Sequence, residues 1–118
     1  MVSVLTFGHS VYVYVEIVKD ATAIARGLAG YAYLAADYGM LFDMGYEDDH
    51  HFWMHGVRFP LDIVFLDPSM TVVGVLADVP AMNDVFRHVG KPSRYVLEVN
   101  ANWAETNGII VGSKGVLH

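Results

Sequence analysis

The residues best suited to chemistry lie together in the middle of the chain: Asp48, Asp49, His50, His51 and His55. Imidazole and carboxylate groups are common zinc ligands, and two histidines four residues apart can bind one ion when they share a helix face. The apolar segment 52–54 instead favours a strand, in which His51 and His55 would lie about 13 Å apart. Zinc holds imidazole nitrogens at about 2.0 to 2.1 Å, so these two histidines cannot share an ion on a straight strand.

A metal site that combines His50 or His51 with the neighbouring carboxylates stays open at this point. Charged side chains in a polar loop are more often simply hydrated, however. We therefore predict no metal ligands and no cofactor for this chain.

Asp62 and Glu98 are a second pair of residues that could do chemistry, because two carboxylates at a suitable separation act as general acid and base in glycoside hydrolysis. Each lies within an apolar segment. A carboxylate in such a segment more often has a structural partner, since a buried charge is tolerated only when it is paired. Arg26 and Arg94 are the available cations. We therefore favour a structural ion pair or hydrogen-bond network among Arg26, Asp62 and Arg94, and we name no catalytic residue.

Trp53 shares one face of its predicted strand with His51 and His55. An exposed indole beside polar groups would form a stacking platform for a sugar or another planar ligand, whereas a buried indole would belong to the core. No serine lies in a Gly-x-Ser-x-Gly motif, and no phosphate-binding glycine motif occurs. These absences argue against a serine hydrolase and against nucleotide binding through such a loop.

The function that these residues favour is a small non-enzymatic module that binds a small molecule or a protein. Its candidate binding face comprises Trp53, His55, Asp62, Arg94 and Glu98. Two alternatives stay open, namely a hydrolase that uses Asp62 and Glu98, and a structural subunit of a larger assembly such as a phage particle.

The elements that must position these residues are mostly strands. Apolar runs at 2–7 and 11–18, joined by Gly8, His9 and Ser10, predict a hairpin. Alternation in the second run places its valines on one buried face. Further strands are expected at 52–57, 61–66, 71–77, 94–100 and 109–111.

Two short helices are expected between the strands. One covers residues 21–28 with Asp20 as its N-cap, and the other lies within residues 101–107. The acidic, glycine-containing segment 43–49 is predicted to be a surface loop. Residues 81–92 show no clean period and receive no element.

Composition narrows the function classes further. With 118 residues, of which 54% are hydrophobic, the chain fits one domain with a large core, and the apolar excess leaves a homo-oligomer or larger assembly open. A net charge of −6, from 13 acidic and 7 scattered basic residues, argues against nucleic-acid binding. The absence of cysteine excludes disulfides. No apolar stretch reaches about 18 residues and the N-terminus lacks signal-peptide features, so we expect no membrane insertion and a cytoplasmic location.

Several segments, taken in order, resemble the signature of a bacterial and archaeal family named domain of unknown function 192. They are Arg26-Gly27-Leu28, Gly39-Met40-Leu41-Phe42, Phe52-Trp53-Met54, the segment from Pro60 to Phe65, and the segment from Arg94 to Ala101. The resemblance implies a single domain over residues 1–118. It also implies a mainly β (α+β) fold, a compact β-sandwich or half-barrel with one or two short helices. It implies no established substrate, cofactor or catalytic residue. Members usually show Lys-Asn-Thr where this chain has His55-Gly56-Val57.

Overall fold

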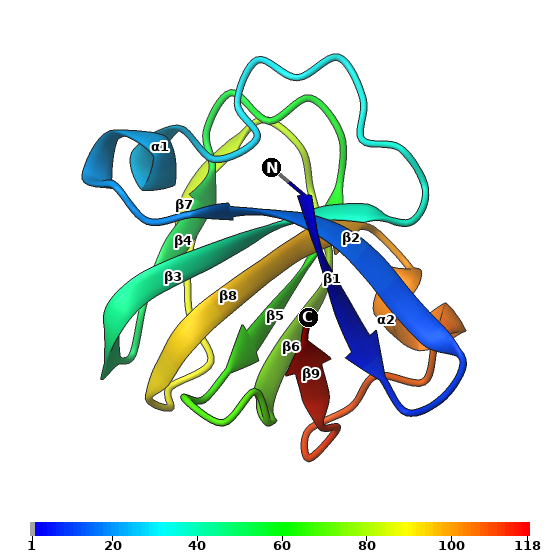
Figure 1. Ribbon diagram of the computed structural model, residues 1–118. Coiled ribbons are helices and arrows are strands. Elements are labelled where there is room, and N and C mark those ends of the chain that lie inside the picture. Colours follow the sequence, from blue (N-terminus) through cyan, green and yellow to red (C-terminus); the bar gives the residue numbers. More distant parts are fainter. Residues whose placement is uncertain (1) are drawn as a thin grey trace.

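The structure is a computed structural model that describes residues 2–118 (Figure 1). Strands hold 51% of the residues and helices 9%, which confirms the predicted mainly β fold. The strands are β1 (Val2–Phe7), β2 (Val11–Val18), β3 (Tyr38–Asp48), β4 (Phe52–Met54), β5 (Leu61–Leu66), β6 (Val72–Val79), β7 (Asn83–Arg87), β8 (Ser93–Asn100) and β9 (Gly115–Leu117). The helices are α1 (Ala21–Arg26) and α2 (Trp103–Thr106).

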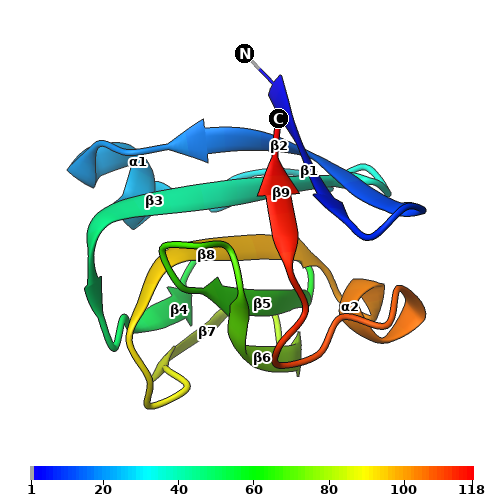
Figure 2. The same ribbon diagram turned by 60° about the horizontal axis from the view of Figure 1, so that its bottom comes forward.

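Seven strands form one sheet in the order β6-β5-β8-β3-β2-β1-β9, and β4 and β7 form a separate two-stranded ribbon. The large sheet curls into a half-barrel, so that β9 lies across its open side (Figure 2). Near this opening Thr71 pairs with Lys114, and the Val72 amide donates a hydrogen bond of 2.9 Å to the Ser113 carbonyl. The predicted half-barrel with two short helices is therefore confirmed.

The antiparallel pair β1–β2 is the hairpin that the sequence predicts, and the expected strands at 61–66 and 71–77 form a second antiparallel pair, β5–β6. Asp20 caps α1 as predicted, because its Oδ2 accepts a hydrogen bond of 3.2 Å from the Ala23 amide. No helix within residues 2–118 is long and apolar enough to cross a bilayer.

The strands β5 and β8 are interior strands of the sheet, and apolar clusters cover both of its faces. One cluster includes Val64 and Leu97 and packs with β1, β2 and α2, while the other includes Ile63 and Phe65 and packs beneath β4. All six residues of β5 are buried for this reason. Residues directly opposite each other on neighbouring strands project from the same face of the sheet. Asp62 of β5 pairs with Val99 of β8, and Ile63 pairs with Glu98. Asp62 and Glu98 therefore leave the sheet on opposite faces.

Three sequence predictions of local structure are wrong. The acidic segment 43–49 is not a loop, because β3 continues through it to Asp48 with an irregular register. The segment 81–92 contains β7, whose mostly exposed residues have no buried face to create alternation. The last strand lies at Gly115–Leu117 and not at 109–111, because residues 111 and 112 form the turn that leads into it.

Gly39 allows β3 to lie close to β8. A Cβ atom at this position would lie 2.7 Å from the backbone oxygen of Glu98 and 2.9 Å from Cγ1 of Val99. We expect Gly39→Ala to lower the free energy of unfolding by about 1 to 3 kcal/mol, the usual cost of forcing atoms into a packed core. Urea denaturation measures this change, and an unaltered midpoint would contradict the close packing.

Candidate functional site

A cavity of about 260 Å³ lies between α1, β3 and the β4–β7 ribbon, over one face of the central sheet. Its walls are largely apolar, and four aromatic side chains contribute to them: Phe42, Phe52, Trp53 and Phe86. The polar lining includes Arg26, His51, His55 and Glu98. A concave, mostly apolar site with a few polar groups is typical of small-molecule binding.

Glu98 is the buried polar group of this cavity. It projects from β8 beside Met40 of β3 and Ile63 of β5, and only 2% of its surface is exposed. Its carboxyl group has no hydrogen-bond or ion-pair partner among residues 2–118. Burial alone raises the pKa of Glu98 to about 8, with no contribution from a charged neighbour. Such a carboxyl group would hold its proton at neutral pH until a ligand supplies a partner.

The end of α1 leaves space above this carboxyl group. A Cβ atom on Gly27 would lie 3.6 Å from Oε1 of Glu98 and 3.4 Å from the Phe42 ring. Gly27 also ends the helix with a φ of 51°, a conformation that favours glycine. The sequence Arg26-Gly27-Leu28 therefore forms part of the cavity wall.

The β4–β7 ribbon forms the opposite wall through stacked rings. The Trp53 ring stacks on Phe86 with centroids 4.7 Å apart and planes 7° apart, and it stacks on His55 at 4.7 Å and 23°. His55 in turn contacts Asp84, with Nδ1 2.9 Å from Oδ1. Trp53 thus contributes to a wall built with two neighbouring rings, and more than half of the Phe86 surface remains exposed.

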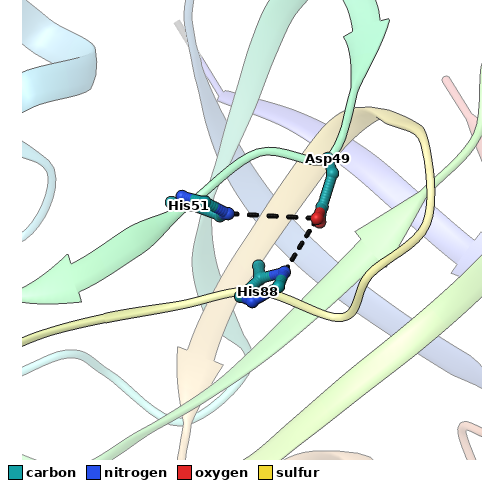
Figure 3. Close-up of side chains that lie close together, drawn as sticks. All are labelled: Asp49, His51 and His88. Carbon is teal, nitrogen blue, oxygen red and sulfur yellow. Dashed lines mark hydrogen bonds and ion pairs between the residues drawn. The ribbon is translucent and has the colours of Figure 1, made fainter.

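A polar cluster formed by Asp49, His51 and His88 adjoins this wall (Figure 3). Nδ1 of His88 lies 2.8 Å from Oδ2 of Asp49, and Nε2 of His51 lies 3.9 Å from the same oxygen. The two imidazole centroids are 4.4 Å apart. The neighbouring His50 points elsewhere, since it is buried and contacts the Tyr46 carbonyl.

Asp62 does not belong to the cavity. It is fully buried, and its carboxylate accepts hydrogen bonds from the backbone amides of Asp78 at 2.9 Å, Asn102 at 3.2 Å and Ala104 at 2.9 Å. It therefore holds the start of α2 and the bend near the end of β6. These three amides satisfy the carboxylate without a cation.

The predicted ion pair of Asp62 with Arg26 or Arg94 is consequently not formed within residues 2–118. Arg94 of β8 instead forms an ion pair with Asp43 of the adjacent strand β3. Nε of Arg94 lies 3.2 Å from Oδ1 of Asp43. Arg26 is exposed and lines the cavity. The alternative hydrolase lacks its catalytic pair as well, because Asp62 and Glu98 lie on opposite faces of the sheet.

Of the five residues of the predicted binding face, the structure brings Trp53, His55 and Glu98 to one cavity and places Asp62 and Arg94 outside it. The sequence did not indicate Phe86 and His88 as site residues. They lie beside Trp53 and His51 only because β7 pairs with β4, which is distant in the chain. It also missed Gly27 as part of the site. The only indication of a role for Gly27 in the sequence was that Arg26-Gly27-Leu28 resembles a signature segment of the family.

Comparisons with known proteins agree with this fold. A candidate transcription regulator from Sinorhizobium meliloti 1021 has a TM-score of 0.95 and 25% sequence identity, over 99% of this chain and 94% of the other. A protein of unknown function from Novosphingobium aromaticivorans DSM 12444 has a TM-score of 0.86 and 28% identity, over 98% of this chain and 82% of the other. No curated protein matches the sequence.

The sequence profile of one family, described as "Uncharacterized ACR" (DUF192), matches residues 3–116. This match covers nearly the whole chain and includes every segment on which the resemblance was based. The chain therefore belongs to the domain of unknown function 192 family.

Proposed function

We propose that this domain binds a small organic ammonium compound, with an apolar or aromatic body inside the cavity and the charged amine against Glu98. The observation that carries the proposal is a buried carboxyl group without a protein partner, facing an aromatic cavity that solvent can enter. A buried polar group normally has a partner, and an exception marks a place where a ligand can supply one.

The chemistry of the walls favours a cation over an anion. An ammonium group would hydrogen-bond to the Glu98 carboxylate and offset its burial, since opposite charges stabilise one another strongly where water is scarce. The faces and edges of the aromatic side chains suit an apolar body, and aromatic faces attract cations. The net charge of −6 also favours the approach of a positive ligand.

Benzylamine is a suitable probe, and benzyl alcohol is its uncharged counterpart of nearly equal shape. We expect benzylamine to shift the indole N–H signal of Trp53 in a saturable way during an NMR titration. Trp103 provides an internal control, because it packs against Phe7 away from the cavity and its signal should stay fixed. Glu98→Gln should weaken benzylamine binding at least about tenfold, the effect of losing one charged contact, and should leave the weak binding of benzyl alcohol unchanged.

Two results would refute the proposal. The first is the absence of saturable benzylamine binding to the wild-type protein. The second is equal benzylamine affinity in the wild type and Glu98→Gln, which would show that any binding comes from apolar contact alone.

A regulator that binds nucleic acid, as the description of the Sinorhizobium protein would suggest, has weaker support in this chain. Acidic residues outnumber basic residues by 13 to 7, whereas nucleic-acid binding requires a concentration of positive charge. The cytoplasmic location and the assembly subunit stay predictions.

A further inference from the structure

We propose that Asp49, His51 and His88 form a binding site for one divalent transition-metal ion of the zinc type. Asp49 lies just after β3, His51 just before β4 and His88 just after β7, and their side chains point toward one another (Figure 3). One donor atom from each lies within 4.8 Å of the donor atoms of the other two. The sequence predicted no metal ligand, because His51 and His55 cannot share an ion on a strand and loop carboxylates are more often hydrated. The residue that joins His51 here is His88, which lies far from it in the chain.

Two of the three donor distances lie close to the separation that a zinc ion requires. Ligand atoms at about 2.0 to 2.1 Å from a tetrahedral zinc ion lie about 3.3 Å from one another. Oδ2 of Asp49 lies 2.8 Å from His88 Nδ1 and 3.9 Å from His51 Nε2, values on either side of that separation. Two imidazoles and one carboxylate leave a fourth position for water or for a ligand atom, as in zinc sites that are not purely structural.

The carboxylate of Asp49 is already oriented for this role. Its Oδ1 accepts a hydrogen bond of 3.1 Å from the Gly90 amide, so Oδ2 is the oxygen that faces the two histidines. A backbone contact of this kind fixes the orientation of a metal ligand. The side chains of His51 and His88 are about half exposed, at 53% and 49%, so an ion can reach them from solvent.

The chain offers a matched control a few residues away. His55 and Asp84 form a similar exposed pair, with Nδ1 2.9 Å from Oδ1, but no third ligand from residues 2–118 joins them. If surface histidines bind zinc merely by their presence, removal of His55 should matter as much as removal of His88. A site of three ligands predicts instead that only the Asp49, His51 and His88 substitutions matter.

Isothermal titration of the full chain with zinc chloride at about pH 7.5 tests this site, because metal binding by these side chains depends on pH. We expect one saturable ion for each chain. Asp49→Ala and His88→Ala should each weaken binding at least about tenfold, the loss typical of one ligand or one orienting contact, while His55→Ala and Asp84→Ala should bind as the wild type does. Cobalt(II) should give the intense visible absorption of a four-coordinate site in the wild type and lose it in His88→Ala.

Unsaturable zinc uptake, or an equal loss in His55→Ala and His88→Ala, would overturn the proposal. Circular dichroism of each variant shows that it is folded before titration. The site shares His51 with the lining of the proposed amine pocket, but Glu98 is not one of its three ligands. Glu98→Gln should therefore bind zinc normally, and a failure of one proposal leaves the other intact.

Discussion

Glu98→Gln should raise the melting temperature of this protein by an amount that grows with pH. Burial raises the pKa of Glu98 from 4.5 to about 8 in the folded protein. Between these values the folded chain holds a proton that the unfolded chain releases, so the free energy of unfolding falls as pH rises. Below about pH 4.5 both states are protonated and Glu98 costs nothing. Above about pH 8 the cost is complete, on the order of 5 kcal/mol.

Glutamine has the shape of glutamic acid and does not ionise in this range. Near pH 5 the two proteins should melt at similar temperatures, because both side chains are then neutral in the folded state. Near pH 9 the variant should melt more than about 10 °C higher, given the usual relation between stability and melting temperature for a chain of this size. Thermal melts at a series of pH values measure the difference. A difference that does not change with pH would show that Glu98 titrates normally.

Asp62→Ala should destabilise the protein strongly. The substitution leaves three backbone amides, those of Asp78, Asn102 and Ala104, without the acceptor that they have in the wild type. An unsatisfied buried donor costs about 1 to 3 kcal/mol. The bond from Ala104 is buried and the other two are partly buried, and Asp78 and Asn102 also have positive φ angles that these contacts help to hold. We expect a loss of about 3 to 5 kcal/mol, measured by urea denaturation.

Asp62→Asn is the matched variant for this prediction. Its single side-chain oxygen can still accept from two of the amides, but its NH₂ group would face the third, so an intermediate loss of about 1 to 3 kcal/mol follows. Benzylamine binding by the folded Asp62→Asn protein should equal that of the wild type, because Asp62 leaves the opposite face of the sheet from Glu98. Wild-type stability in Asp62→Ala would contradict the capping role.

Local patterns in the sequence predict most elements of this fold. The alternating valines of β2 and the turn residues before it identify the first hairpin, and Asp20 identifies the start of α1. Hydrophobic alternation does not predict a strand whose residues are exposed on both faces. The outer half of β3 and all of β7 are mostly exposed, so their residues follow turn and loop preferences while their backbones still pair.

The candidate site could be predicted only in part, for a related reason. Trp53, His55 and Glu98 stand out by type and context, and the structure places all three around one cavity. The partner of Asp62 could not be inferred, because backbone amides from distant segments satisfy it and a sequence shows only the charged alternatives. The convergence of His51 with His88 likewise depends on how β4 and β7 pair.

An NMR titration of the Glu98 side-chain carboxyl carbon observes the group on which the proposed amine pocket depends. In the free protein the midpoint should lie near pH 8. Saturating benzylamine should lower this midpoint, because a bound ammonium group stabilises the carboxylate. A midpoint near 4.5 in the free protein, or one that benzylamine leaves unchanged, would mean that Glu98 is not the group that binds the amine.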